Sequence, residues 1–212
     1  MKKNQLILKR FFDFLFSILG LVITFPFILI FYLIVFFTSQ QNGLYKSTRI
    51  GQHGHPFTMW KLRTMRPHPT LNTTVTSSRD IRITPFGRLL RRTKLDELPQ
   101  LWNVLKGDMS LVGPRPDVPG FADQLQGDDR KILSVRPGIT GLATLAFRDE
   151  EVVLANQTDP ERYNREVIWP EKVRLNRYYL EHYSLSLDFN ILFKTVFGGT
   201  ISVTKKSYPT KT

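Results

Sequence analysis

The hydrophobic pattern divides the chain into one long apolar segment followed by a mixed remainder. Residues 14–37 form a run of 24 residues that carries no charge. As a helix rising about 1.5 Å per residue, this run would match the roughly 30 Å hydrocarbon core of a bilayer. Pro26 lies near its middle, where proline removes a helical hydrogen bond and favours a kink or break. The pattern therefore indicates a membrane segment that is interrupted halfway.

Basic residues flank the apolar run on both sides, with Lys9 before it and Lys46 after it. Because basic flanks favour the cytoplasmic face of a membrane, we expect both ends on that face. Residues 1–40 are therefore predicted to form a re-entrant helix–break–helix hairpin whose break falls at Phe25 and Pro26. The alternative is one membrane-spanning helix that is kinked at the proline, which such helices tolerate.

Residues 41–204 have the pattern of one small α/β domain that is mainly helical, and residues 205–212 form a polar tail. Residues 44–65 predict two short strands around a glycine turn. Leucines at three- and four-residue spacings predict a helix over 84–106 that is kinked at Pro99. The other expectations are a polar loop over 67–80 and helices within 117–135, over 159–183 and over 185–196. Apolar stripes on such helices suit the surface of a membrane.

Two close pairs of residues each allow two interpretations. Arg10 and Asp13 have the spacing of an ion pair within a helix, or they anchor the entry of the hairpin. His53 and His55 have the spacing of a metal-binding pair on a strand, or they are two residues of a turn. We favour the simpler interpretation of each, an ion pair and two turn residues.

The charge balance narrows the choice of partners. The chain has 30 Lys and Arg against 18 Asp and Glu, which gives a formal net charge of +12. This excess favours an anionic partner such as nucleic acid, anionic lipid headgroups or a phosphorylated substrate. No helix-turn-helix, RNP or zinc pattern is present, so we expect no nucleic-acid partner. The absence of cysteine excludes disulfides, thiolate zinc sites and cysteine nucleophiles.

The candidate chemistry concentrates around the adjacent carboxylates Asp96 and Glu97. Such pairs are usually solvated surface, but here basic residues, among them Arg88 and Arg91, crowd the same segment and favour the ionised, nucleophilic form. Arg115 lies between two prolines, which hold its guanidinium ready for a two-point contact with phosphate. Carboxylates, cations and a rigid arginine are the groups that phosphoryl transfer on a divalent metal requires.

With these segments in view, the chain resembles a known family, the bacterial sugar transferases, which are monotopic phosphoglycosyl transferases acting on polyprenyl phosphate. The resemblance covers essentially the whole chain, and its most specific part is T-P-F-G-R-L-L-R-R-T-K-L-D-E-L-P-Q-L-W-N-V-L-K-G-D-M-S-L-V-G-P-R-P at 84–116. The other matches are K-R-F-F-D-F at 9–14, the proline-broken apolar segment, R-I-G-Q-H-G-H-P-F-T-M-W-K-L-R-T-M at 49–65 and R-P-G-I-T-G at 136–141. We expect the minimal catalytic form of this family.

The resemblance implies transfer of a phosphosugar from a UDP-sugar to undecaprenyl phosphate, at the cytoplasmic leaflet of the bacterial inner membrane, to start surface glycan synthesis. Asp96 would attack the sugar-linked phosphorus, release UMP and carry the phosphosugar until the lipid phosphate accepts it, in a ping-pong exchange. Glu97 would assist, and both carboxylates would hold Mg²⁺. Arg115 and Arg148 would bind phosphate.

Four further cations are candidates for contact with phosphate or substrate: Lys61, Arg63, Arg88 and Arg91. Lys61 and Arg63 could equally face anionic lipid. Asn176 stands where the resemblance leads us to expect an aspartate, which leaves the sugar-binding side undefined.

Two other functions stay open at this point. A membrane-associated glycosyltransferase would release UDP instead of UMP, and a basic membrane-anchored binding protein would have no catalytic activity. The resemblance also leaves a homodimer possible. The sequence specifies neither the sugar nor the glycan pathway.

Overall fold

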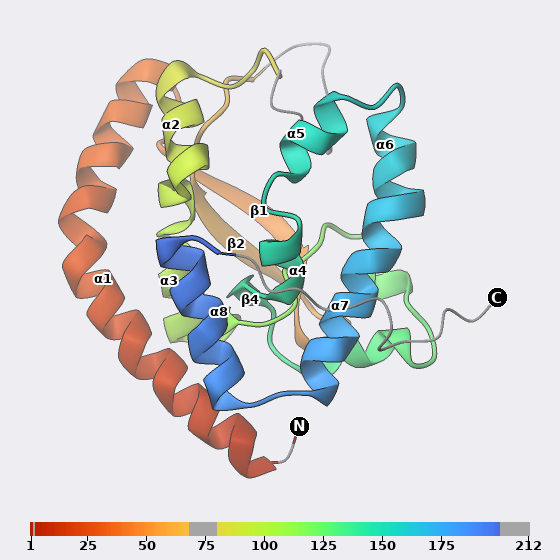
Figure 1. Ribbon diagram of the computed structural model, residues 1–212. Helices are drawn as coiled ribbons and strands as arrows, with labels where there is room; N and C mark the ends of the chain where they lie inside the picture. Colours follow the sequence, from red (N-terminus) through yellow and green to blue (C-terminus); the bar gives the residue numbers. More distant parts are fainter. Residues whose placement is uncertain (2, 68–79, 200–212) are drawn as a thin grey trace.

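The computed structural model describes residues 1, 3–67 and 80–199 and shows a mainly helical α/β domain (Figure 1). Its strands are β1 (Leu44–Ile50), β2 (Pro56–Leu62), β3 (Ser110–Val112) and β4 (Gly138–Thr140). Its α-helices are α1 (Lys3–Ser39), α2 (Pro85–Thr93), α3 (Gln100–Lys106), α4 (Leu142–Ala146), α5 (Glu150–Ala155), α6 (Pro160–Tyr163), α7 (Trp169–Glu181) and α8 (Leu185–Phe197). Almost all of the loop expected over 67–80, and the whole tail at 205–212, lie outside the described residues.

The strands form two small sheets. β1 and β2 pair antiparallel, with Ser47 opposite Met59, and β3 pairs with β4 in parallel. The predicted glycine turn is present between β1 and β2, where Gly54 has a φ of +84° that suits glycine. His53 and His55 are exposed in and beside this turn, as turn residues are expected to be.

The predicted helix over 84–106 is present in three pieces. Thr84 caps α2 by accepting from the amide of Gly87 at 2.9 Å, and Pro85 is its first residue. Contrary to the expected single kink at Pro99, the chain already turns at Lys94, a left-handed residue with a φ of +59°. A 3₁₀ turn (Leu95–Glu97) follows, and α3 then runs to Gly107. The two carboxylates therefore lie on a separate turn between two helices.

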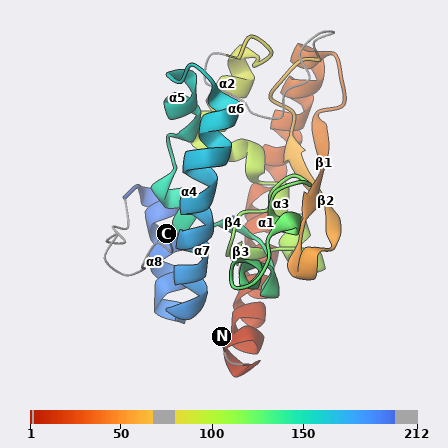
Figure 2. The ribbon, with the colours of Figure 1, turned by 90° about the vertical axis from the view of Figure 1, so that its right-hand side faces the viewer.

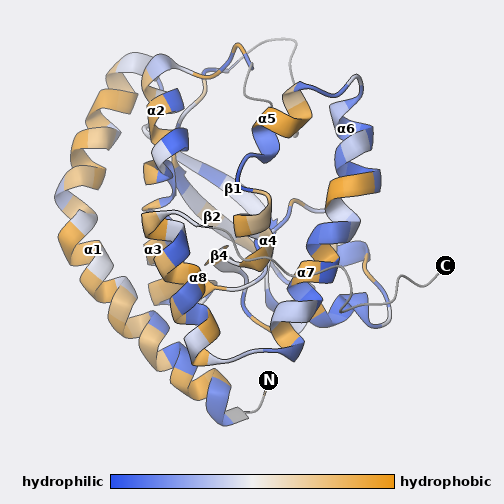
Figure 3. Cartoon of the chain, viewed as in Figure 1, coloured by the Kyte–Doolittle hydropathy of each residue, from blue (hydrophilic) through white to orange (hydrophobic). Residues whose placement is uncertain are grey.

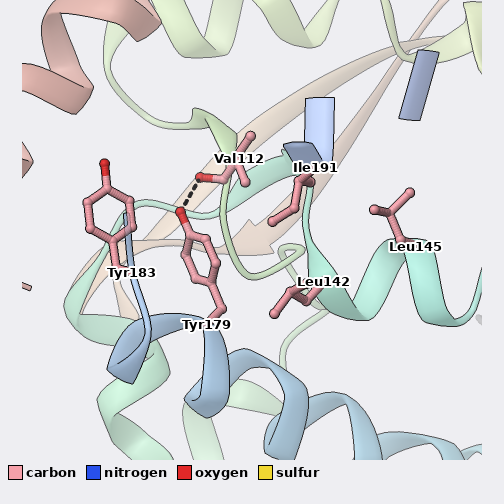
Figure 4. Packing of buried hydrophobic residues seen from close by; sticks show 6 residues of the cluster. All are labelled: Val112, Leu142, Leu145, Tyr179, Tyr183 and Ile191. Carbon is pink, nitrogen blue, oxygen red and sulfur yellow. Dashed lines mark hydrogen bonds between the residues drawn. The ribbon is translucent and has the colours of Figure 1, made fainter. Parts of the chain in front are cut away.

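The main core lies where α4, α7 and α8 meet β3 (Figure 4). Tyr179 of α7 is enclosed there, and its hydroxyl donates to Asp188 of α8 at 2.7 Å. The same hydroxyl lies 3.4 Å from the carbonyl of Val112. This packing ties the last two helices to the small parallel sheet. Turned by 90°, the domain shows the β1–β2 hairpin at the edge opposite α7 and α8 (Figure 2).

α1 is one continuous helix that follows a curved path along one side of the domain (Figure 1). The expected break at Phe25 and Pro26 is therefore wrong as an interruption of the helix. Pro26 is exposed on the outer side. At this position α1 bends toward the domain. The bend makes room for the proline ring and accommodates the missing hydrogen bond, so the helix continues.

The polarity of α1 is inverted relative to a helix on a water-soluble domain. Its buried inner positions include Lys9, Asp13 and Ser17, which recur every four residues. Its outer face is apolar (Figure 3), and Val22 and Phe37, for example, are 70% and 74% exposed. Such a helix is long and apolar enough to serve as a membrane anchor.

Both flanks of α1 are fastened to the same domain. Near its start, Arg10 donates to the carbonyls of Val104 and Leu105 at 2.6 and 2.9 Å, and Asp13 accepts from the amide of Leu111 at 2.9 Å. The favoured interpretation, an ion pair between Arg10 and Asp13, is therefore wrong. The alternative holds, because each side chain separately anchors the start of α1 to the domain. Near its end, Val35 joins a buried cluster on β2 and α2.

Candidate functional site

The site is built on the 3₁₀ turn that carries Asp96 and Glu97. Both carboxylates are buried, with exposed fractions of 6% and 7%. Glu97 accepts from the Lys61 ammonium at 3.2 Å. It also accepts from both terminal nitrogens of Arg115, through Oε2 at 3.1 Å and through Oε1 in a shorter contact. Both oxygens of Glu97 are therefore occupied by cations from distant parts of the chain.

Asp96 has a different environment from its neighbour. Its Oδ1 is fully buried and accepts no hydrogen bond. Within residues 1, 3–67 and 80–199, no lysine or arginine forms an ion pair with it. Because Oδ1 is enclosed, Oδ2 is the oxygen that can approach a substrate. The two adjacent carboxylates thus differ: one is saturated and the other is free to react.

The pKa values of the pair move in opposite directions. Burial raises the pKa of Asp96 above its ordinary value, although Lys61 and two other cations oppose this effect. Burial acts in the same sense on Glu97, but Arg115 and Lys61 outweigh it and lower the pKa of Glu97 well below its usual range. Nearby cations do favour the ionised form of Glu97, as expected, but the main ones are Lys61 of β2 and Arg115 after β3 and not the basic residues that flank the dyad in sequence.

Arg115 is positioned by the rigid Pro114–Pro116 segment, as the two prolines indicated. This segment follows β3. Its backbone is fixed by a hydrogen bond of 2.8 Å that the amide of Gly138 in the neighbouring strand β4 donates to the carbonyl of Pro114. A further bond from Nη1 to the carbonyl of Ile139 at 3.2 Å fixes the guanidinium. Arg115 is therefore preset before any substrate binds.

The structure brings together only some of the candidate cations. Lys61 joins Arg115 at Glu97. Arg91 lies on the same side but pairs with Glu151 of α5 at 2.8 Å, so it links α2 to α5. Arg63 turns away and donates to the carbonyl of Asn42 at 2.8 Å.

Neither of the last two candidates pairs with the dyad in the described part of the chain. Arg88 is exposed on α2. Arg148 borders the cavity described below, but it also donates to the carbonyls of Lys194 and Thr195 at the end of α8, at 2.9 and 3.2 Å. Arg148 therefore joins α4 and α8 as well as facing the site.

A cavity of about 250 Å³ adjoins the dyad, because Arg115 and Lys94 form part of its wall. Five further charged residues of the wall were not singled out from the sequence: Arg49, Asp117, Glu150, Glu151 and Lys172. Arg49 is the last but one residue of β1, close to the glycine turn, and Asp117 directly follows the Pro-Arg-Pro segment. Their positions next to recognised motifs were therefore the available signal. Lys172 lies in mid-helix and gave no such signal.

The cavity wall contains polar groups that the protein leaves without partners. The Thr144 hydroxyl is buried and makes no hydrogen bond. Asn176 is 4% exposed and lies in the same wall, as does Asp117. Burial raises the pKa of Asp117 to about 6, although Lys172 and Arg49 oppose this effect. Aromatic rings complete the wall at Phe121, Phe147 and Trp169.

Asp96 is the free carboxylate with which this site could hold a metal ion. Across the part of the chain that the structure describes, no group of three or more His, Asp or Glu is arranged for one. Mg²⁺ is commonly bound by one or two carboxylates together with substrate phosphates. The unpaired carboxylate of Asp96 suits such a shared site, whereas Glu97 would first have to release a cation.

Comparison with known proteins indicates the family of the chain. The family model for bacterial sugar transferases matches residues 4–201. The UDP-glucose:undecaprenyl-phosphate glucose-1-phosphate transferase of Klebsiella pneumoniae is 33% identical over 203 residues, which are 93% of this chain and 41% of that protein. The undecaprenyl-phosphate galactose phosphotransferase of Salmonella typhimurium is 34% identical over 213 residues, or 92% and 40% of the two chains.

A shorter relative is similar over almost its whole length. The exopolysaccharide production protein PSS of Rhizobium leguminosarum bv. phaseoli is 35% identical over 200 residues, which are 91% of this chain and 94% of that protein. The chain thus spans about two fifths of the two longer relatives, at 41% and 40%, and nearly all of the third. By the match over 4–201 and these identities, the chain belongs to the bacterial sugar transferase family.

Proposed function

We propose that this protein transfers a phosphosugar from a UDP-sugar to undecaprenyl phosphate and so starts the synthesis of a bacterial surface glycan. The observation that carries the proposal is the contrast within the dyad: Asp96 is unpaired, while Glu97 is saturated by Lys61 and Arg115. Attack on a phosphorus atom requires a nucleophile without a competing partner, here the carboxylate, and fixed cations that stabilise the charge of the phosphoryl group. Residues 41–204 would carry the reaction.

The reaction takes two displacement steps. Oδ2 of Asp96 forms a bond to the sugar-linked phosphorus, the bond from that phosphorus to the bridging oxygen breaks, and UMP leaves with the electron pair. An oxygen of undecaprenyl phosphate then bonds to the same phosphorus, and the Asp96 carboxylate leaves unchanged. The product is undecaprenyl-diphosphate-sugar. Splitting the exchange into two steps lets a soluble donor and a membrane-bound acceptor use the same nucleophile in turn.

Arg115 and Arg49 would each bind one of the two phosphates of the donor. Arg115 is already oriented by Glu97, so it offers its remaining donor capacity to the phosphoryl group under attack. The Arg49 side chain makes a single hydrogen bond in the described part of the chain, from Nε to the Ser47 hydroxyl at 3.1 Å, which leaves its terminal nitrogens for the second phosphate. The aromatic and neutral polar wall of the cavity suits the uncharged parts of the donor.

Mg²⁺ fits this scheme through Asp96 and the phosphates of the donor, where it would neutralise the charge of the diphosphate. Glu97 contributes by holding Lys61 and Arg115 in place. Its own oxygens become available to the ion only when one of these two cations moves to phosphate.

We also infer that α1 is a re-entrant anchor in the cytoplasmic leaflet of the bacterial inner membrane, with its bend at Phe25 and Pro26 deepest. This proposal is supported by the two flanks, because Arg10 and Val35 both pack on the same domain. A helix that crossed the bilayer would separate these flanks by the full thickness of the membrane.

The absence of cysteine makes the topology testable by labelling. Single cysteines at Asn4 and at Gln40 should both react with a membrane-impermeant maleimide in inverted vesicles and both be protected in right-side-out vesicles. A spanning helix would give opposite results for the two positions, and that outcome would reject the re-entrant anchor.

Nucleotide release tests the function itself. Purified protein in nanodiscs is incubated with undecaprenyl phosphate, Mg²⁺ and a panel of UDP-sugars, and UMP and UDP are quantified. We expect UMP from one donor, and none from the Asp96→Asn variant. Asp128→Asn is the matched control, because Asp128 lies on the surface in an exposed pair with Lys131.

Incubation with the donor alone then tests the covalent step. Intact-mass spectrometry should show a gain equal to one phosphosugar on the wild type and on Asp128→Asn, but not on Asp96→Asn. Release of UDP would indicate a plain glycosyltransferase, and no release of nucleotide from any donor would favour a non-catalytic binding protein.

A further inference from the structure

Gln100 is a fully enclosed polar side chain close to the dyad in the chain. Its exposed fraction is 0%, and neither its Nε2 nor its Oε1 has a hydrogen-bond partner in the structure. Most buried polar side-chain atoms in proteins do have a partner, and leaving one without a partner destabilises the folded state. An apolar residue of the same shape would avoid this cost, so stability alone does not account for a glutamine here.

The position of Gln100 relates it to the nucleophile. It opens α3, four residues after Asp96 and three after Glu97, shortly beyond the 3₁₀ turn that carries both carboxylates. One turn further along α3, Val104 packs with Met59 of β2. Gln100 is as fully buried as Val104, so its side chain lies on the inner side of α3, close in the chain to the turn that carries the dyad.

The unpartnered amide has a matching unpartnered acceptor. Oδ1 of Asp96 is buried without a hydrogen bond, while the cations nearest to the turn, Lys61 and Arg115, are committed to Glu97. A carboxylate held by nothing but its own backbone rotates about its side-chain torsions. A nucleophile must instead keep one oxygen in line with the phosphorus, since small losses of alignment cost large factors in rate.

We propose that Gln100 is a positioning residue for Asp96: its buried amide holds one enclosed water that donates to Oδ1 and so aims Oδ2 at the phosphorus. An enclosed water is expected where two to four polar groups surround it, and the two amide atoms with Oδ1 provide three. In the covalent adduct, Oδ1 becomes the carbonyl oxygen of the acyl phosphate and still accepts this hydrogen bond. The inference rests on the proposed function of Asp96.

The test separates positioning from structural support. Gln100→Met keeps the size of the side chain and removes the amide, whereas Gln100→Asn keeps an amide on a shorter arm. We expect Gln100→Met to unfold at the same or a higher temperature than the wild type, with kcat for UMP release about 10- to 100-fold lower and an unchanged KM for the donor. Gln100→Asn should recover part of the loss in kcat.

Two outcomes would overturn the proposal. Gln100→Met with wild-type kcat would show that the amide has no part in the reaction. If Gln100→Met does not fold, a fully active Gln100→Asn variant whose covalent adduct forms at the wild-type rate would show tolerance of a displaced amide and would equally reject positioning. Failure of the proposed function is distinct, because the wild type itself would then release no UMP.

Discussion

Arg115 donates hydrogen bonds to Glu97 from both terminal nitrogens of its guanidinium, one to each carboxylate oxygen. This two-point contact, with Lys61 as a third donor, leaves Glu97 no free oxygen within reach of a substrate. The adjacent Asp96 has no such partner. The structure therefore separates two roles that identical side-chain chemistry could share: Glu97 organises cations, and Asp96 is available for attack.

Replacing Arg115 tests the importance of this fork. Arg115→Lys keeps the charge but loses the planar pair of N–H donors that contacts both oxygens, so we expect kcat/KM for UMP release to fall about 100-fold. Arg115→Ala should cost more and should also lower the free energy of unfolding by about 2–3 kcal/mol, because a charged hydrogen bond to buried Glu97 is lost. Steady-state kinetics and chemical denaturation measure both effects.

Arg63→Lys is the control for the loss of an arginine on the same stretch of chain. Arg63 turns to the Asn42 carbonyl and away from the dyad. The Arg63→Lys variant should keep kcat/KM within about twofold of the wild-type value, a difference in activation free energy of about 0.4 kcal/mol. An equal loss in the two lysine variants would mean that overall positive charge, and not the fork, supports activity.

Asp117 predicts a specific dependence of stability on pH. Burial raises its pKa to about 6, above the ordinary 3.8. Between these values the folded state holds the proton that the unfolded state releases, so this residue makes stability fall as pH rises from about 4 to 6. Asp117→Asn should match the wild type near pH 4 and exceed it above pH 6.5, by about 1–3 kcal/mol.

Asp123 provides a control of opposite sign for thermal unfolding measured across this pH range. Burial alone would slightly raise the pKa of Asp123, but its bond from the Gly120 amide and others lower it. Asp123→Asn should therefore be slightly less stable than the wild type above pH 4, and the difference should vanish as pH falls. If both asparagine variants shift stability in the same direction, burial of Asp117 is not the cause.

Much of the fold followed from local signals in the sequence. Thr84 and Pro85 marked the start of α2, and Gly107 marked the end of α3, because caps and stops depend on neighbouring residues alone. The turn at Lys94 was missed. A lysine with a positive φ is uncommon, and here the helices on either side impose it, which no local pattern announces.

The residues of the site could be predicted where they belong to a local motif. The ion pairs between residues that are distant in the sequence could not be predicted. Asp96, Glu97 and Arg115 could be named from their motifs, but the basic residues next to the dyad in sequence do not form its ion pairs. Lys61, 36 positions before Glu97, does. The continuous path of α1 through Pro26 likewise depends on the domain that the helix curves around.

The buried ion pair between Lys9 and Asp188 should couple α1 to α8. Lys9 Nζ lies 2.7 Å from Oδ2 of Asp188, and each side chain is only 8% exposed. Removing one partner leaves the other charge buried, so Lys9→Met or Asp188→Asn alone should cost about 3–5 kcal/mol of stability. The double variant should cost clearly less than the sum of the two single variants.

A double-mutant cycle by denaturation in detergent measures this coupling. Arg162 and Glu166, an exposed pair on the surface at 3.0 Å, serve as the control cycle and should couple by less than about 1 kcal/mol. Additive effects in the Lys9 cycle would contradict a buried coupling and would mean that α1 is fastened chiefly by its other anchors.

Trp102 tests which face of the domain meets lipid. It lies on α3 beside α1 and is 54% exposed, an unusual state for tryptophan on a surface that faces water. If this face lies on the membrane, brominated lipids in nanodiscs should quench a large share of the tryptophan fluorescence, and Trp102→Phe should remove most of that quenching. Trp169→Phe is the matched control, because Trp169 lines the donor cavity. Quenching that survives Trp102→Phe but disappears with Trp169→Phe would place the cavity on the lipid side and reverse the proposed orientation, since a soluble nucleotide could not then reach the dyad from the cytoplasm.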